Sequence, residues 1–569
     1  MAGLAIRGRP GAMRLRPARD EIAMRVMLVL LGLWLLATVA LPLWTLLSKS
    51  FQDFNGNFVG LANYVRYVST PSLLASFWNS LTIATITTAI VIPLAFVYAY
   101  ALTRSCMRWR GLFQALALIP ILAPSLLPAI ALIYLFGNQG FLKFLLFGNT
   151  IYGPLGIVIA QVFYCFPHAL MILVTALAMA DARLYEAASV LGASRTRTFF
   201  TVTLPGAKYG LISAGFVVFT LVITDFGIAK VIGGRFNVLA TDVYKQVVGQ
   251  QNFEMGAVVG MVLLVPAVLA FVADRVVQRR QVAVLSARAV PLQPKPASLR
   301  DWLLFAYCVA VAAILLTILG VAAWGSLIKF WPYNLTLTLD NYAFDKFDAT
   351  GWRAYFNSLE LAALTATFGT ALVFVGAYLM EKSRGFGFGR GVVQLLAMLP
   401  LAVPGLVLGL AYIFFFNAPS NPLGFVYGTM AILVINTIAH FYTVSHLTAV
   451  TALKQLDAEF EAVGASLKVP FWTTLTRVTI PVCSPAILDI FVYLFVNAMT
   501  TVSAVIFLYS TYTKLASITV VNMDEAGFTA AAAAMSVTIV LTSAVVKLLH
   551  LALDRLLART THAWRRRTR

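Results

Sequence analysis

Charged residues are scarce in this chain: 11% of its 569 residues are Asp, Glu, Lys or Arg, whereas 60% are hydrophobic. A soluble domain carries about 25% charged residues, so this composition excludes an ordinary water-soluble protein. The apolar residues form solid blocks, each long enough to cross a hydrocarbon core of about 30 Å as a helix. Strict alternation, the pattern of a membrane β-barrel, is missing. The composition therefore predicts an all-α polytopic membrane protein.

Cysteine is rare as well, and the four cysteines (positions 106, 165, 308 and 483) form no Cys-x-x-Cys pair. Neither a disulfide framework nor a metal site is predicted. The chain contains no Gly-x-x-x-x-Gly-Lys-[Ser/Thr] motif and no Gly-Lys dipeptide, so it has no P-loop for nucleotide phosphates. We therefore expect no cofactor in this chain and no enzymatic activity of its own.

The net charge of +20 comes from basic residues in short loops between the apolar blocks. Alternate loops are rich and poor in Lys and Arg, as the positive-inside rule requires, and this favours topology signals over a nucleic-acid-binding patch. We expect twelve spans, with both termini in the cytoplasm. The predicted spans are about 25–48, 77–103, 112–137, 153–180, 207–232, 254–274, 302–328, 355–381, 391–416, 424–450, 484–508 and 528–550.

The sequence also repeats itself about 278 residues apart. Leu61-Ala62-Asn63-Tyr64 returns as Leu339-Asp340-Asn341-Tyr342, and Asn79-Ser80-Leu81 returns as Asn357-Ser358-Leu359. In the third span of each half, Pro120 and Pro124 correspond to Pro400 and Pro404. Such a duplication indicates two equivalent halves.

The repeat and the charge pattern together predict five segments. They are a basic cytoplasmic N-terminus (1–24), a first six-span domain (25–274), a cytoplasmic linker (275–300), a second six-span domain (301–552) and a basic cytoplasmic tail (553–569). Since each half has an even number of spans, the halves run parallel across the membrane. The linker contains Pro-Leu-Gln-Pro-Lys-Pro and is expected to be extended and semi-rigid.

A long polar segment follows the fourth span. It runs from Asp181 through Glu186-Ala187-Ala188 and Gly192 to Leu204-Pro205. The pattern predicts a short helix over 185–191, a glycine break, a second short helix over 198–203 and a stop at Pro205. A helix–turn–helix on the cytoplasmic surface with an exposed glutamate is typical of a docking element.

The Glu-Ala-Ala, Gly and Leu-Pro pattern resembles the EAA loop of permease subunits of bacterial ABC importers. The resemblance implies a type I (MetI-like) importer fold with two pseudo-symmetric six-helix halves in the bacterial inner membrane. It implies that Glu186 and Ala187 contact a homodimeric cytoplasmic ATPase, which binds ATP and Mg²⁺, and that Gly192 permits the turn. A periplasmic or lipid-anchored substrate-binding protein would deliver the cargo.

The second copy departs from this pattern. It reads Asp457-Ala458-Glu459-Phe460-Glu461-Ala462-Val463-Gly464 and continues to Ile480-Pro481. Alignment from the proline places Lys468 where the first copy has Gly192. We still expect a coupling helix that includes Gly464 and Pro481, and either Glu459 or Glu461 would face the ATPase.

Polar residues within spans are expensive and usually face a cavity or a partner. Asp225 is the first candidate for the translocation path, and Thr501 is its counterpart in the second half. The other candidates are Glu360, Asp489, Gln161 and Asn436. The alternative for each is an interior hydrogen bond that fixes helix packing.

The whole chain resembles the fused, double-length permeases of the ferric-iron and phosphonate importer group. Thr224-Asp225-Phe226-Gly227, the segment 242–251 and the segment 461–472 look like the 2-aminoethylphosphonate branch, which implies 2-aminoethylphosphonate as cargo. Ferric iron, a polyamine or another small oxyanion remain alternatives. An ion-driven secondary transporter would explain the spans and the duplication, but it would not explain the paired loops.

Overall fold

The computed structural model describes residues 19–282, 290, 292–383, 386–457, 459–467 and 469–561. Within these residues, nine helices are long and apolar enough to cross a membrane, and three further pairs of bent helices bring the number to twelve if each pair is one span. The predicted all-α membrane fold is thus confirmed. Most of the predicted N-terminal segment and parts of the linker and the tail lie outside the described residues.

The first half contains thirteen α-helices in the described part of the chain. They are α1 (Arg19–Leu35), α2 (Leu41–Ser50), α3 (Ala62–Ser69), α4 (Pro71–Arg104), α5 (Arg110–Leu118), α6 (Leu126–Phe136), α7 (Pro154–Ala178), α8 (Ala182–Val190), α9 (Arg195–Thr198), α10 (Leu204–Thr224), α11 (Gly227–Ile232), α12 (Leu239–Tyr244) and α13 (Phe253–Val282).

Among the described residues, the second half follows a similar order, with no α-helix at the positions of α3 and α11, and has a two-stranded antiparallel hairpin after its first helix. Its elements are α14 (Ser298–Leu327), β1 (Ile328–Phe330), β2 (Asn334–Leu337), α15 (Gly351–Lys382), α16 (Gly387–Met398), α17 (Gly405–Phe416), α18 (Met430–Lys454), α19 (Glu459–Ser466), α20 (Phe471–Thr474), α21 (Ile480–Val482), α22 (Ser484–Thr500), α23 (Ala516–Glu525) and α24 (Thr529–Thr561).

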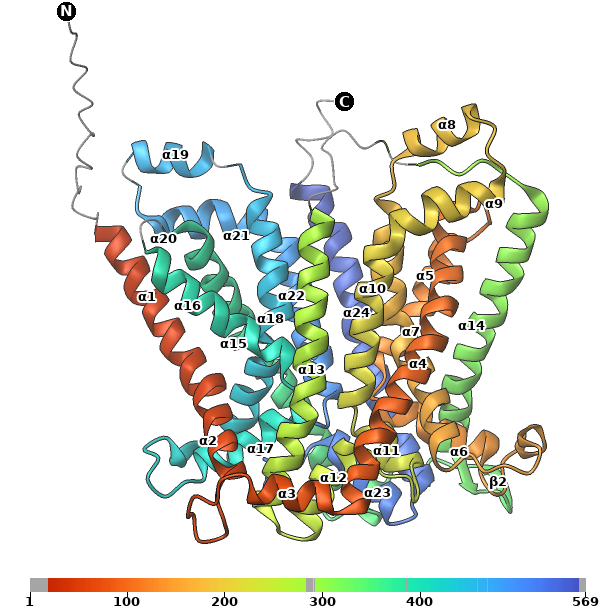
Figure 1. Cartoon of the computed structure of the whole chain (residues 1–569), viewed down its shortest axis with the longest axis vertical. Coiled ribbons are helices and arrows are strands. Elements are labelled where there is room, and N and C mark those ends of the chain that lie inside the picture. The colour runs from red at the N-terminus through yellow and green to blue at the C-terminus, as the bar shows by residue number, and fades with distance from the viewer. Residues whose placement is uncertain are drawn as a thin grey trace, which may run out of the picture.

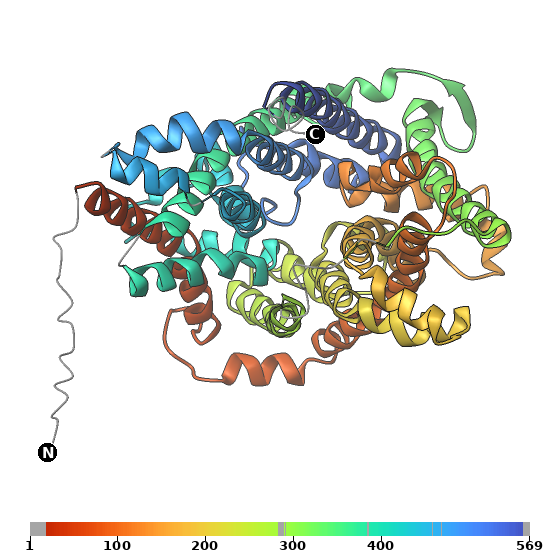
Figure 2. The ribbon, with the colours of Figure 1, turned by 90° about the horizontal axis from the view of Figure 1, so that it is seen from above.

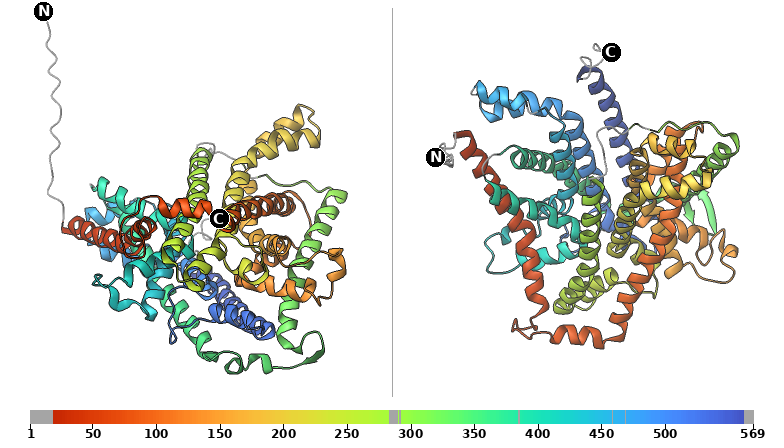
Figure 3. Two further views of the ribbon diagram at one scale, coloured as in Figure 1. Left: turned by 60° about the horizontal axis from the view of Figure 1, so that its bottom comes forward. Right: turned by 45° about the horizontal axis from the view of Figure 1, so that its top comes forward.

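The helices run between two ends of the molecule, and Figure 1 shows which elements gather at each. The short helices α8 and α19 lie at one end, which we call the loop end. At the opposite end lie α11, α12 and α23, together with α3, which Figures 1 and 3 show lying across the bundle. We call this the far end.

The first helix of each half packs against the other half. α1 contacts α15 and α16, and α2 contacts α17. In the opposite direction, α14 contacts α4, α5 and α6. Figure 2 shows both first helices on the flanks of the opposite bundle. The halves are therefore interlocked by an exchange of helices, which repeats and hydropathy do not reveal.

The third span of each half is broken, as its prolines predict. α5 and α6 meet at an angle of 100°, and α16 and α17 meet at 116°. Pro124 and Pro404 lie in the breaks themselves. A proline has no N–H group for the helical ladder, so a break at this position leaves fewer donors unpaired.

The repeated Asn-Tyr motif ties the end of each half's first span to the following segment. Asn63 Nδ2 donates to the backbone oxygens of Ser50 at 3.1 Å and Gln52 at 2.8 Å. The hydroxyls of Tyr64 and Ser50 lie 2.8 Å apart. The second half repeats every contact. Asn341 Nδ2 donates to the backbone oxygens of Ser326 (3.0 Å) and Ile328 (2.7 Å), and the hydroxyls of Tyr342 and Ser326 lie 2.9 Å apart.

The repeated Asn-Ser pair positions a short helix at the far end in each half. Asn79 Nδ2 donates to Asn237 O at 2.9 Å, and Ser80 Oγ accepts from the N–H group of Leu239, the first residue of α12, at 2.8 Å. The second half holds α23 in the same way. Asn357 Nδ2 donates to the backbone oxygens of Tyr512 and Lys514 (2.9 Å each), and Ser358 Oγ accepts from the N–H group of Ala516 (2.8 Å). Both repeated motifs thus serve architecture.

The predicted fifth spans, 207–232 and 484–508, were too long. The helices end at Thr224 and Thr500, and in each case the next residue is extended, with φ/ψ of −72°/129° at Asp225 and −66°/135° at Thr501. In the first half, the carboxylate of Asp225 accepts from the N–H group of Ile228 at 2.9 Å, which starts the new helix α11. Apolar composition continues through both breaks, so hydropathy could not show them.

The predicted stop at Pro205 was wrong. Helical residues continue without a gap from Arg195 to Thr224, through a π-helical turn at Phe199–Thr203. Pro205 lies in the first turn of α10, where a missing N–H group costs little because the widened turn has already shifted the hydrogen-bond register. In the second half the chain does break, at Cys483, with an angle of 77°.

Candidate functional site

Two polar loops lie at the same end of the molecule, each after the fourth span of its half (Figure 1). The first consists of α8 and α9, and the second of α19 and α20. This placement brings together the two segments that the sequence singled out as docking elements, although they are far apart in the chain.

Local hydrogen bonds shape the first loop. Asp181 caps α8 by accepting from the N–H group of Arg183 at 3.1 Å, and Ser194 caps α9 by accepting from that of Arg197 at 3.2 Å. Between these helices, Gly192 has φ of +70°, a left-handed conformation that side chains with a Cβ atom disfavour. The predicted glycine turn is therefore present, with α8 beginning three residues earlier than expected.

The second loop follows the first with a constant offset. Two backbone hydrogen bonds of the first loop recur at residue numbers 276 higher. The N–H group of Leu191 donates to Ala187 O (3.0 Å), as that of Leu467 does to Val463 O (3.0 Å). The N–H group of Ala193 donates to Ala188 O (2.9 Å), as that of Val469 does to Gly464 O (2.9 Å). Asp457 likewise accepts from the N–H group of Glu459, at 3.0 Å.

This register decides which residues correspond. The position equivalent to Glu186 is Ala462, and Glu461 precedes it by one residue, about 100° around a helix. Gly464 corresponds to Ala188, so it is not the counterpart of Gly192. Neither glutamate of the second loop takes the place of Glu186.

The exposed surface of both loops combines acidic and apolar side chains. Glu186, Ala187, Pro205, Glu459 and Pro481 are all exposed. The apolar residues beside them are exposed too, up to 88% for Val190: Leu184, Val190 and Leu191 in the first loop, and Phe460, Val463 and Leu467 in the second. Exposed apolar groups in clusters mark surfaces for protein partners. These apolar residues were not predicted as site residues, although their place on short polar helices was a usable signal.

The first loop is fixed to the bundle beneath it. The Tyr185 hydroxyl donates to Thr203 Oγ1 at 3.0 Å, next to Glu186. The buried guanidinium of Arg104 lies 5.4 Å from the centre of the Tyr185 ring and donates to Leu177 O at 2.7 Å. These contacts join α8 to the ends of α4 and α7 and to the π-helical turn that leads into α10.

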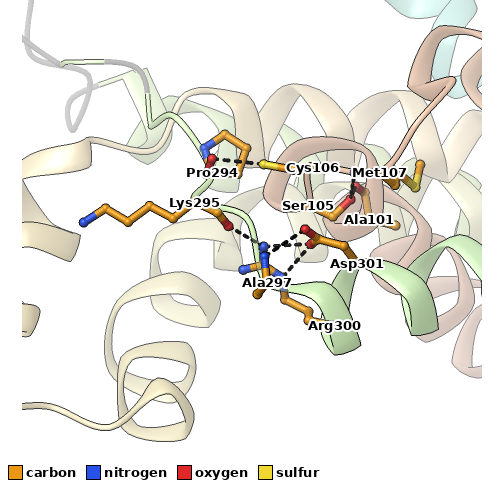
Figure 4. A network of polar contacts seen from close by, with 9 residues as sticks. All are labelled: Ala101, Ser105, Cys106, Met107, Pro294, Lys295, Ala297, Arg300 and Asp301. Atoms are coloured by element: carbon orange, nitrogen blue, oxygen red, sulfur yellow. Dashed lines mark hydrogen bonds and ion pairs between the residues drawn. The ribbon is translucent and has the colours of Figure 1, made fainter.

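The interdomain linker also contacts the first loop. Val290 accepts from the N–H group of Ala182 at 2.9 Å and donates to Asp181 Oδ1 at 3.3 Å. Farther along, Cys106 Sγ donates to Pro294 O at 3.2 Å, as Figure 4 shows.

The end of the linker is fixed to the start of α14 in the same network. Asp301 accepts from the N–H group of Ala297 at 3.0 Å and pairs with Arg300 at 2.8 Å (Figure 4). The described part of the linker is therefore attached to the first loop, to the loop after α4 and to the second half.

Asp225, the first candidate for the path, lies in a hydrogen-bonded break between α10 and α11. Its carboxylate accepts from Gln161 Nε2 of the fourth span at 3.0 Å, besides the bond from Ile228. The Ser125 hydroxyl is a further partner. Gln161 and Asp225 line a cavity of about 10 Å³, which is the size of one water molecule. The geometry favours a packing role for Asp225 and offers no space for a cargo there.

Asn436 repeats the role of Gln161 in the second half. Its Nδ2 donates to Ala504 O at 2.7 Å, in the segment that follows the fifth span of that half. Thr501 ends α22 as Asp225 ends α10, and its backbone oxygen accepts from Ser517 Oγ at 2.6 Å. An amide on the fourth span thus holds the break after the fifth span in both halves.

The two remaining candidates lie apart from this network. Glu360 is exposed on α15. Asp489 of α22 is 59% exposed and lies 3.3 Å from Nε2 of His550 of α24. The structure therefore brings Gln161 together with Asp225, and it separates Glu360 and Asp489 from them.

Comparison with known proteins identifies the family. The family model described as "Binding-protein-dependent transport system inner membrane component" matches residues 92–282 and 372–559, one segment in each half. A protein named as a ferric transport system permease in Haemophilus influenzae is 30% identical over 449 residues, covering 75% of this chain and 69% of its own. The ferric transport system permease protein of Actinobacillus pleuropneumoniae is 28% identical over 513 residues, with 86% and 71% covered.

More distant relatives match one half. A spermidine/putrescine permease of Escherichia coli is 27% identical over 253 residues, covering 42% of this chain and 92% of its own. A bacterial alginate ABC transporter solved with its periplasmic protein is similar to 46% of this chain and 96% of its own, at 15% identity and a TM-score of 0.40. From the two matched segments, the chain belongs to the family of inner-membrane components of binding-protein-dependent transport systems.

Proposed function

We propose that this chain forms the translocation path of an ATP-driven importer of the inner membrane. Both halves are fused in it, and the loop end faces a cytoplasmic ATPase dimer. The observation that carries the proposal is the pair of loops. They have one internal register, lie at one end of the molecule, and expose apolar and acidic side chains. Two such loops match the two protomers of a dimeric ATPase.

The mechanism needs two states and a partner that favours one of them. ATP binding would close the ATPase dimer and draw α8 and α19 together. Because α8 is attached to α4, α7 and α10 through Tyr185 and Arg104, the movement would be passed to the spanning helices. The far end would then open to cargo delivered by a binding protein, and hydrolysis would restore the first state.

The names of the relatives suggest which cargoes to test first. The two relatives that cover most of the chain are named for ferric transport, so ferric iron is the first cargo to test. 2-Aminoethylphosphonate, which the segments around Asp225 and 242–251 suggested, is the second. Polyamine permeases match single halves and give a third.

Uptake into membrane vesicles that contain the chain, its ATPase and its binding protein tests the function. We expect uptake that requires ATP and that vanadate inhibits. Uptake that a protonophore abolishes, with no need for ATP, would identify an ion-driven secondary transporter instead. Offering ⁵⁵Fe³⁺, 2-aminoethylphosphonate and a polyamine in parallel, each with the binding protein, would identify the cargo.

A further inference from the structure

A charged contact joins the two halves at the far end. Lys230 of α11, in the first half, forms an ion pair with Glu525, the last residue of α23, in the second half. Their side chains are 19% and 44% exposed, respectively, so the lysine is the more enclosed partner. A partly enclosed pair is less screened by salt than one at an open surface.

Aromatic rings extend this contact. The Lys230 ammonium lies 4.6 Å from the centre of the Tyr244 ring, within the range of a cation–π interaction. The Tyr244 ring in turn stacks on Phe507 of the second half, with centres 6.3 Å apart and planes at 23°. The ring of Phe226, beside the break at Asp225, also packs against Tyr244, with ring centres 5.1 Å apart and planes at 44°. We call Lys230, Tyr244, Phe507 and Glu525 the clasp.

The clasp is absent from the pseudo-symmetric position. The offset of 276 places Ile506 where the first half has Lys230. The Ser80 and Ser358 contacts align Leu239 with Ala516, an offset of 277, so the counterpart of Glu525 is Val248. Both counterparts are apolar. The charges are therefore present in one copy only, and packing of the duplicated fold does not require them.

We infer that the clasp holds the far end closed, and that separation of Lys230 from Glu525 accompanies its opening to cargo. This inference rests on the proposed import function. A contact made in only one of two states stabilises that state, so its loss shifts the population toward the other. Removing either charge should favour the state in which ATP is hydrolysed, even when no binding protein is present.

The test measures ATP hydrolysis by the complete complex in proteoliposomes, with and without the binding protein. Lys230→Gln and Glu525→Gln should each raise hydrolysis several-fold in the absence of the binding protein. The exchange Lys230→Glu with Glu525→Lys should return it toward the wild-type value. Unchanged hydrolysis in both single variants, or an exchange variant that stays as active as the single variants, would overturn the inference.

A matched control is available at the same end. Lys514 and Asp348 also form an ion pair, but both belong to the second half. Lys514→Gln should leave hydrolysis without the binding protein at the wild-type value, because the ion pair that it removes lies within one half. An equal rise in this variant would show a general loosening and would count against the clasp.

A cross-link gives an independent readout. Lys230→Cys and Glu525→Cys would be combined in a variant whose four native cysteines are replaced. A short bifunctional methanethiosulfonate should then abolish uptake, and a reducing agent should restore it. Normal uptake by the linked protein would overturn the inference. If the wild-type complex shows no hydrolysis that depends on the binding protein, the proposed function itself fails, and the inference fails with it.

Discussion

The Gln161 side-chain amide donates a hydrogen bond of 3.0 Å to the Asp225 carboxylate, joining the fourth span to the break after the fifth. Asn436 holds the equivalent break in the second half through Ala504 O. The first bond has a charged acceptor and the second a neutral one. Bonds to charged groups contribute about 1.5–3 kcal/mol and neutral bonds about 1 kcal/mol, so the two halves are held unequally.

Gln161→Leu should therefore destabilise the protein more than Asn436→Leu does. We expect about 2 kcal/mol for the former and about 1 kcal/mol for the latter. Thermal unfolding of the purified variants in detergent measures both. If Asp225 instead binds cargo, Asp225→Asn would raise the KM for uptake while the melting temperature stayed near that of wild type. Equal melting temperatures for the two leucine variants would contradict the packing role.

The Asn-Tyr motif should contribute to the stability of the protein and should not affect ATP hydrolysis by the complex. Asn63→Ala removes two hydrogen bonds and leaves the backbone oxygens of Ser50 and Gln52 without this partner. The expected loss is about 1–3 kcal/mol, and Asn341→Ala should lose a similar amount at the duplicated site. Once folded, both variants should hydrolyse ATP at the wild-type rate in the complex. A change in hydrolysis without a change in melting temperature would assign the motif a functional role.

The effect of replacing Gly192 should depend on how well the new residue tolerates a left-handed backbone, and not on the size of its side chain. A Cβ atom there would meet no neighbour within 4 Å, so the cost of Gly192→Ala is the left-handed backbone, about 1 kcal/mol. Gly192→Asn should cost less, because asparagine tolerates this conformation. Hydrogen exchange of the α8 amides would measure the difference. Equal protection in the two variants would contradict this account.

Asp524 should make stability depend on pH. Burial, with a smaller contribution from Glu525, raises the pKa of Asp524 from 3.8 to about 6. The carboxylate also acts electrostatically on Tyr134 and Tyr152 of the first half. A carboxyl with a raised pKa costs stability once it ionises, so the cost is absent below about pH 4 and complete above about pH 6.

Asp524→Asn removes that cost. The variant should melt at a higher temperature than wild type at about pH 7.5, and the difference should shrink as the pH falls through about 6. Comparing the two proteins at each pH cancels the titration of every shared group. A difference that is constant with pH, or that grows on acidification, would contradict the assigned pKa direction.

Much of the fold was predictable because the length of each apolar block and the charge of each loop are local properties of the sequence. The first indicates the membrane spans, and the second indicates their orientation. The repeated motifs showed in the sequence that the chain has two halves, and the structure adds that Asn63 and Ser80 form hydrogen bonds with backbone groups. The helix break at Asp225 was missed, since apolar composition continues through it. The exchange of α1 and α14 between the halves was also missed, because nothing in a single sequence states which bundle a spanning helix joins.

The candidate site was predictable in its first copy and ambiguous in its second. Glu186 and Gly192 carry a recognisable pattern, and the structure places them on an exposed helix and in a left-handed turn. For the second loop, the choice between Glu459 and Glu461 depended on register. Alignment from Pro205 and Pro481 already gives an offset of 276, and the backbone hydrogen bonds confirm this register, which places Ala462 opposite Glu186.

The central claim is that the first loop couples ATP hydrolysis to transport through Glu186. The most direct test measures ATP-driven uptake in proteoliposomes for wild type, Glu186→Lys and the control Asp340→Lys. The control makes the same change of charge at a residue that is 63% exposed, before α15. We expect all three proteins to insert equally, and only Glu186→Lys to lose ATPase binding and uptake, by at least tenfold. Wild-type uptake by Glu186→Lys would show that Glu186 does not couple hydrolysis to transport.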